Sequence, residues 1–202
     1  MKNSRRKWED YWSKKKTKTT VNKERMIKIL ERYKYKKALD AGCGSGFFSK
    51  YFASKGDVIA LDYSKTALKV TKKLNKKIKV VRGDVFHIPF KDDTFDLIFS
   101  DGLLEHYRNP SDILREFKRI LKPEGIIATF VPNKFSYWCF VKPLFLKKIE
   151  EYRFTLKELI KFHEDVELDI IESGGFSVFP FHFSPEFLGE RIGRIIYAIA
   201  KK

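Results

Sequence analysis

Between residues 36 and 133, short apolar runs alternate with segments of helical periodicity. The runs are rich in Val, Ile, Leu and Phe and nearly continuous in apolarity, which is typical of strands buried on both faces of a parallel sheet. Strands are predicted at 36–41, 57–62, 78–84, 95–101 and 125–133, with helices at 46–56, 64–76 and 110–121. This alternation predicts an α/β fold, a doubly wound, Rossmann-like, mostly parallel sheet with helices on both faces.

The remaining segments extend the same unit. The chain has 202 residues, and no repeat or Pro/Ser-rich linker divides it, so a single domain over 1–202 is expected. Within it we expect an N-terminal helical lid at 1–35, a core at 36–133, and a substrate-side lid with C-terminal strands at 134–202. Residues 155–166 predict a helix that begins at a Thr155 cap.

The composition excludes several classes of protein. No apolar run is long enough to span a membrane, and no apolar stretch of a signal peptide follows the basic N-terminus, so we expect a cytoplasmic protein. The two cysteines, Cys43 and Cys139, are predicted to be free thiols of a reducing compartment. No Cys/His spacing indicates zinc, and no metal site is predicted.

The net charge of +16 is unevenly spread. Residues 1–37 hold fifteen Lys/Arg against four Asp/Glu, and residues 65–82 hold eight Lys/Arg and no acid. Such surfaces attract nucleic acid, anionic lipid or acidic small molecules. A solvated, lysine-rich surface of a thermophilic or AT-rich source explains the same charge, and the sequence leaves both interpretations open.

The stretch ALDAGCGSGFFS places glycines at 42, 44 and 46, directly after the first predicted strand. Glycine there permits unusual dihedral angles and a close approach of the backbone to a ligand. The phosphate-loop pattern is excluded, because no Lys-Ser or Lys-Thr follows Gly46 at the required spacing. The dinucleotide pattern is disfavoured, because Phe47 stands where its third glycine or alanine is needed.

Acidic residues follow successive strands of this basic chain. They are Asp40, Asp62, Asp84 and Asp101, with Glu105 close behind. Carboxylates accept hydrogen bonds from ribose hydroxyls and amines and attract a positive centre, so they suit a ligand that carries these groups. Capping of the following helices would account for any single one of these acids but poorly for the whole set.

Five pieces in order resemble the class I S-adenosylmethionine-dependent methyltransferases, in particular the small-molecule branch of ubiquinone/menaquinone-biosynthesis-like enzymes. The pieces are LDAGCGSG, ALDYS, RGDVFHIPF, FDLIFSDGLLEHY and FKRILKPEGIIATFVPN, within residues 36–133. One departure is Glu124, at a strand-entry turn where the family often has glycine. The resemblance also implies a final antiparallel strand, for which RIIYAIAKK at 194–202 is the candidate.

The resemblance implies that the cofactor is S-adenosyl-L-methionine, with S-adenosyl-L-homocysteine as product. The loop of Gly42, Cys43, Gly44 and Gly46 would pass under the methionine part, with Asp40 ordering the loop or binding the amine.

The same resemblance places the rest of the cofactor on later strand ends. Asp62 would accept from the ribose hydroxyls, and Tyr63 would pack near the adenine. Asp84 would accept from the adenine amine, and Val85 would offer its backbone N–H. Ser100 would face the methionine part.

Methyl transfer needs mainly alignment of acceptor and donor and exclusion of water, so a base is not obligatory. His106, just after the fourth strand, is the candidate catalytic base, ahead of Glu105 and Tyr107. The alternative is that His106 packs against the next helix or only shapes the pocket.

Two aromatic segments, Lys7–Trp12 and Phe135–Leu146, are expected to close over a small-molecule acceptor, which an apolar or lipid-like compound would fit. The interleaved aromatic and basic residues also leave peripheral membrane contact open. Two other functions are kept as alternatives: an RNA methyltransferase that uses the basic N-terminal face, and a non-catalytic cofactor-binding module. Nucleic acid is disfavoured, because no Asn/Asp-Pro-Pro-Tyr motif follows the fourth strand. The oligomeric state is not predicted.

Overall fold

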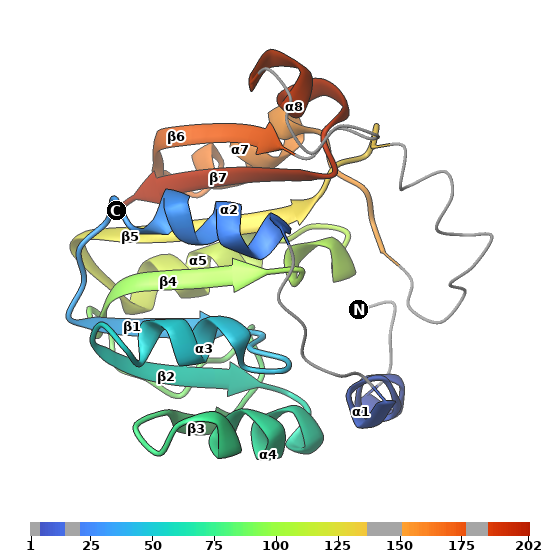
Figure 1. Ribbon diagram of the computed structural model, residues 1–202. Helices are drawn as coiled ribbons and strands as arrows, with labels where there is room; N and C mark the ends of the chain where they lie inside the picture. Colours follow the sequence, from blue (N-terminus) through green and yellow to red (C-terminus); the bar gives the residue numbers. More distant parts are fainter. Residues whose placement is uncertain (1–4, 15–20, 137–150, 177–185) are drawn as a thin grey trace.

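The computed structural model describes residues 5–14, 21–136, 151–176 and 186–202. Its centre is a seven-stranded sheet of order β3-β2-β1-β4-β5-β7-β6 (Figure 1). The strands are β1 (Lys37–Ala41), β2 (Asp57–Asp62), β3 (Lys79–Arg82), β4 (Phe95–Asp101), β5 (Leu121–Pro132), β6 (Asp169–Phe176) and β7 (Ile195–Lys201). β1 to β5 pair in parallel, whereas β7 runs antiparallel to β5 and β6. The predicted doubly wound sheet with an antiparallel C-terminal strand is confirmed.

Helices cover both faces of the sheet (Figure 1). They are α1 (Arg5–Lys14), α2 (Val21–Leu30), α3 (Phe47–Phe52), α4 (Lys65–Leu74), α5 (Ser111–Ile120), α7 (Leu156–Glu164) and α8 (Glu186–Ile192), with a 3-10 turn, η1 (Leu104–His106). Alternate strand residues face opposite layers: Val58 packs in the cluster that includes α2 and α3, and Ile59 in the cluster with α5 and α7. Within the described residues, no helix has the length and apolarity to cross a membrane.

Local sequence signals account for where the helices begin. The Ser64 hydroxyl accepts from the Ala67 N–H at 3.1 Å and caps α4. Thr155 and Glu158 form a reciprocal capping box at the start of α7, with distances of 2.8 and 3.2 Å. These caps fix two of the helices that flank the sheet.

The boundaries that differ most from the prediction are the end of α3 and the start of β5. α3 ends at Phe52, and tight turns made by Ser54 and Lys55 carry the chain to the expected stop at Gly56. β5 begins at Leu121, before the predicted start, because Leu121 pairs with Phe95 ahead of a register shift. Both differences depend on pairing rather than on the hydrophobic pattern.

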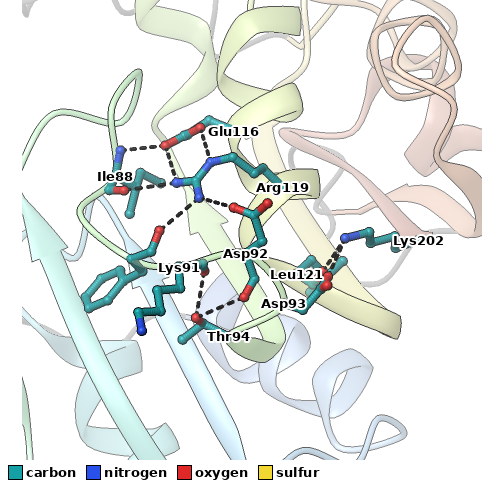
Figure 2. A network of polar contacts seen from close by, with 10 residues as sticks. Ile88, Lys91, Asp92, Asp93, Thr94, Glu116, Arg119, Leu121 and Lys202 are labelled. Carbon is teal, nitrogen blue, oxygen red and sulfur yellow. Dashed lines mark hydrogen bonds and ion pairs between the residues drawn. The ribbon is translucent and has the colours of Figure 1, made fainter.

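A polar network at the amino-terminal edge of the sheet fixes the loop before β4 (Figure 2). Arg119 of α5 donates to both oxygens of Glu116 at 2.8 Å and to Asp92 at 2.5 Å. The same guanidinium donates to the Phe90 and Ile88 carbonyls. One arginine therefore holds this loop to α5.

Glu124 occupies a left-handed backbone conformation, with φ of 65°. This conformation costs a residue with a β-carbon about 1–2 kcal/mol, a cost that glycine would not have. Its side chain is 77% exposed and forms an ion pair with Lys201, and such exposed pairs contribute little to stability.

We expect Glu124→Gly to raise the free energy of unfolding by about 0.5–1 kcal/mol, because relief of the left-handed strain exceeds the added entropy of glycine in the unfolded chain. Glu124→Ala is the matched control, since it removes the ion pair and keeps the β-carbon. Urea unfolding of both variants measures the effect. Equal stabilities of the two would show that φ at this position carries no cost.

Candidate active site

The glycine loop lies between β1 and α3, at the carboxyl end of β1. Gly42, Gly44 and Gly46 have φ of 73°, 52° and 74°. A β-carbon on Gly44 would come within 2.3 Å of the Trp12 ring, and one on Gly46 within 2.5 Å of the Thr71 hydroxyl. Only glycine therefore allows the close packing seen on this loop.

Asp62, the last residue of β2, holds the glycine loop in place. Its buried carboxylate accepts from the Gly44 N–H and from the Ser64 N–H, both at 2.8 Å. Burial raises the pKa of Asp62 above its usual value, against the opposing effect of these hydrogen bonds. A carboxylate has about four acceptor positions, so this one retains capacity for further hydroxyl donors.

Asp40, near the end of β1, is buried and accepts from the Ser49 hydroxyl at 2.5 Å. Burial, with a smaller effect of the nearby carboxylates of Asp101 and Asp62, raises its pKa to about 7, against the opposing Ser49 hydrogen bond. The structure thus brings three carboxyl groups from β1, β2 and β4 into electrostatic contact. A positively charged ligand would relieve their mutual repulsion.

Cys43 and Thr71 join the loop to α4. The buried Cys43 thiol lies 3.7 Å from the Thr71 hydroxyl, which donates to the Gly44 carbonyl at 3.1 Å. Burial raises the pKa of the Cys43 thiol well above its usual value, so the thiol stays protonated and serves packing.

Ser100 and His106 follow each other along the end of β4 and η1. Ser100 is buried, and its hydroxyl has no hydrogen-bond partner within the part of the chain that the structure describes. The buried His106 ring meets the Trp8 ring of α1 edge to face at 4.6 Å. A buried hydroxyl without a protein partner can hydrogen-bond to a polar ligand.

The residues predicted to bind adenine lie after β2 and β3. Tyr63 is 37% exposed, and the exposed Asp84 accepts from the Phe86 N–H at 3.1 Å. Val85 is buried. Tyr107, directly after η1, interacts electrostatically with Asp84, Asp62 and Tyr63. These side chains therefore gather at one edge of the sheet.

Helix α1 lies across this edge, on the side toward which the arrows of β1, β2 and β4 point (Figure 1). Its Glu9 accepts from the Ser64 hydroxyl at 2.9 Å and from the N–H groups of Lys65 and Thr66 at 2.8 and 3.1 Å. Burial opposes the ionisation of Glu9, but the hydrogen bonds of Thr66, Lys65 and Ser64 outweigh it and lower the pKa to about 2. An ionised carboxylate at a helix N-terminus also interacts favourably with the helix dipole, so Glu9 fastens α1 to α4.

Known proteins resemble this chain in sequence. Residues 39–129 match the Methyltransferase domain family. A demethylmenaquinone methyltransferase of Staphylococcus carnosus is 32% identical over 178 residues, which cover 77% of this chain and 74% of the relative. The chain is a class I S-adenosylmethionine-dependent methyltransferase of the ubiquinone/menaquinone type.

Solved structures share the fold of this methyltransferase. A methyltransferase of Haloferax volcanii, solved in complex with the Trm112 methyltransferase activator, superposes with a TM-score of 0.75 at 18% identity and covers 98% of this chain and 97% of its own. An S-adenosylmethionine-dependent methyltransferase of Mesorhizobium loti has a TM-score of 0.73 at 16% identity and covers 91% and 98%. The predicted family, enzyme class and cofactor are confirmed, and the individual roles of the site residues remain predictions.

The residues present fit S-adenosylmethionine. They comprise a loop with three glycines, a buried Ser100 hydroxyl, and the carboxyl groups of Asp40, Asp62 and Asp101, which together suit a ligand with a positive charge and polar groups. The contacts that Glu9 and Thr71 make with this site were not predicted. The available signals were the acidic pair Glu9–Asp10 in a basic N-terminal segment and a threonine among apolar helix positions.

Two buried groups give the methyltransferase opposing responses to pH. Asp40 has a pKa of about 7 when folded against 3.8 ordinarily, so the folded state binds more protons between these values. The protonated Asp40 therefore contributes about 4 kcal/mol to the free energy of unfolding, and this contribution is lost as the pH rises from 3.8 to about 7. His163 of α7 is fully buried, and this burial lowers its pKa from 6.5 to about 4. The neutral His163 therefore contributes about 3 kcal/mol to the free energy of unfolding, and this contribution is lost as the pH falls from 6.5 toward 4.

Between about pH 4 and 6.5, we therefore expect the free energy of unfolding of Asp40→Asn to rise more steeply with pH than that of the wild type. In the same range, we expect the free energy of unfolding of His163→Gln to fall as the pH rises. Urea unfolding across this range measures both slopes. The double variant is the control, and its slope should return toward that of the wild type. Parallel profiles for all four proteins would contradict the assignment.

Proposed function

We propose that this methyltransferase transfers the methyl group to a small molecule that carries a quinone-like ring. The observation that carries the proposal is the aromatic enclosure at the end of β4. Trp8 stands edge to face on His106 at 4.6 Å, and Phe86 on Tyr107 at 5.0 Å. A flat apolar ring packs against such groups better than a polar or highly charged acceptor does. The name of the demethylmenaquinone relative supports the same class of acceptor.

The glycine loop is the proposed support for the methionine part of the cofactor. Gly42, Gly44 and Gly46 would let the backbone approach it closely, and Cys43 would line the loop with its buried thiol. Asp40 would order the loop through Ser49 and attract the amine.

The adenosine part is proposed to lie over the ends of β2 and β3. The free acceptor positions of Asp62 suit the two ribose hydroxyls. Tyr63 is exposed enough to cover an adenine ring, while Asp84 and the backbone N–H of Val85 would take the adenine edge. The unpartnered Ser100 hydroxyl would meet the methionine part.

Bound S-adenosylmethionine supplies a methyl group already activated by the sulfonium. His106 is proposed to take the proton from a hydroxyl of the reduced ring, and the electron pair of that O–H bond then enriches the ring carbon that receives the methyl group. That carbon would afterwards release its own ring proton to solvent, which restores the aromatic ring. The aromatic side chains around His106 would exclude water and hold the ring plane.

The proposed lid is α1, which Glu9 fastens over the site. The domain division into a lid at 1–35, a core at 36–133 and a C-terminal part at 134–202 remains a proposal. α2, within 1–35, packs against the core through Met26 and Leu30. Cys139 and most of the second predicted lid, 135–146, lie outside the described residues.

We propose the cytoplasm as compartment, since Cys43 is a free thiol.

The test is transfer of labelled methyl from S-adenosylmethionine to a water-soluble reduced naphthoquinone, with tRNA offered in parallel. Calorimetric binding of S-adenosylmethionine and S-adenosylhomocysteine first establishes a competent protein. Label in the naphthoquinol supports the proposal. Label in tRNA alone, or none in the naphthoquinol despite bound cofactor, would overturn it.

A further inference from the structure

One outer face of the molecule carries unbalanced positive charge. It is formed by α4, the following turn and β3, at the β3 end of the sheet (Figure 1). Residues 65–82 contain no acid, and all eight of their cationic side chains are exposed. They are Lys65, Lys69, Lys72, Lys73, Lys76, Lys77, Lys79 and Arg82. We name this surface the α4–β3 basic face.

The cations of the basic face have no ion-pair partner in the ranges that the structure describes, and Lys72 donates only to backbone carbonyls. Several cations elsewhere in the described residues form ion pairs. Arg119 pairs with Glu116 and Asp92, and Lys202 with Asp93 (Figure 2). Further pairs are Arg32–Glu172, Lys55–Glu31, Arg115–Asp112, Lys118–Glu167 and Lys122–Asp96. The α4–β3 basic face thus combines eight exposed cations with no acid of its own and no ion pair among the described residues.

The basic face borders the proposed cofactor site. Its first residue, Lys65, donates its N–H to Glu9 of the α1 lid at 2.8 Å. Its last residue, Arg82, donates to the Tyr63 carbonyl at 3.3 Å, two positions before Asp84. A large anionic partner on this face would therefore lie next to the lid and the rim of the site.

We propose that the α4–β3 basic face docks on an anionic lipid bilayer. A bilayer presents a plane of negative charge to which a row of exposed lysines adds favourably, one cation at a time. Helix α1 lies next to this face and carries the exposed Lys7, which adds to the positive charge that a bilayer would meet, while its Trp8 and Trp12 pack toward His106 and Gly44. The choice of lipid over nucleic acid rests on the proposed function, since a quinone-like acceptor with an apolar tail resides in membranes.

Vesicle cosedimentation of the full chain tests the proposal without any acceptor or activity. We expect binding to vesicles of phosphatidylcholine with phosphatidylglycerol, none to phosphatidylcholine alone, and loss of binding at about 1 M salt, where the screening length falls to about 3 Å. The double variant Lys69→Glu/Lys73→Glu should bind at least tenfold more weakly, since two favourable cations become two repelled anions.

The matched control is Lys157→Glu/Lys161→Glu on α7. These two lysines are also exposed and four residues apart, so the change in net charge and helix spacing is the same, but α7 lies at the other end of the sheet. We expect this control to keep binding within about twofold of the wild type. Equal loss in both variants would overturn the proposal, because binding would then follow net charge and not this face.

Three further outcomes are decisive. Absence of wild-type binding to anionic vesicles at low salt overturns the inference. Retention of tRNA that depends on Lys69 and Lys73, without vesicle binding, assigns the face to nucleic acid and also overturns it. Cofactor calorimetry and methylation of the soluble naphthoquinol should be unaffected in both variants. These two assays therefore report on the proposed function separately from the docking face.

Discussion

Replacement of His106 by glutamine is expected to lower kcat for the quinone-like acceptor by about 10²- to 10³-fold, the usual contribution of a positioned general base. Glutamine keeps much of the bulk that packs against Trp8 but cannot take up a proton. Because His106 is proposed to act on the acceptor, the Kd for S-adenosylmethionine should stay within about twofold. Stopped assays with labelled methyl, together with calorimetry, measure both quantities.

His87→Gln is the matched control, since it makes the same exchange at an exposed imidazole in the loop before β4. A positioning role for His106 would leave a pH-dependent kcat in the variant, whereas a base role predicts that the dependence on a group titrating near neutral pH disappears. A kcat within about twofold of the wild type would rule out the base role.

Replacement of Asp62 by alanine is expected to weaken the binding of S-adenosylmethionine about 100-fold, because it would remove the two proposed hydrogen bonds to the ribose and the glycine loop would lose its anchor at Gly44. Calorimetry with S-adenosylmethionine and S-adenosylhomocysteine should give the same loss for both, since they share the ribose.

Asp57→Ala is the control for this variant. Asp57 begins the same strand at the opposite edge of the sheet and is exposed, so its loss should leave the cofactor affinity unchanged. Thermal unfolding followed by circular dichroism shows whether Asp62→Ala still folds, and Asp62→Asn serves as a milder second variant. A folded Asp62 variant with unaltered affinity would remove Asp62 from the proposed site.

Much of the fold could be predicted because its signals are local in sequence. Ser64 and Thr155 cap helices through residues three positions ahead, so the pattern alone indicates where α4 and α7 begin. The three glycines of the loop after β1 also indicate, from the sequence alone, a backbone conformation that other residues rarely adopt. The family resemblance followed from the order of such local pieces.

The contacts of α1 could not be predicted, because they join residues far apart in the chain. Glu9 meets the N-terminus of α4 across more than fifty residues, and Trp8 meets His106 across almost a hundred. Composition reveals only that this segment is basic and aromatic.

The position of β6 could not be predicted either, since Gly174 and Gly175 weaken its strand pattern. The reason for Gly175 is the backbone of Gly189 in α8, which a β-carbon would meet at 2.2 Å.

The place of β7 between β5 and β6 has a consequence for synthesis on the ribosome. β6 precedes β7 in the chain but pairs with it in the sheet, so β6 has no strand to join while it is being translated. β1 to β5 are already complete by then and can assemble as the polypeptide emerges. The nascent chain therefore carries an unpaired β6, and an open edge on β5, until the last strand leaves the exit tunnel. At that stage the unfinished protein offers two strand edges to chaperones or to neighbouring nascent chains.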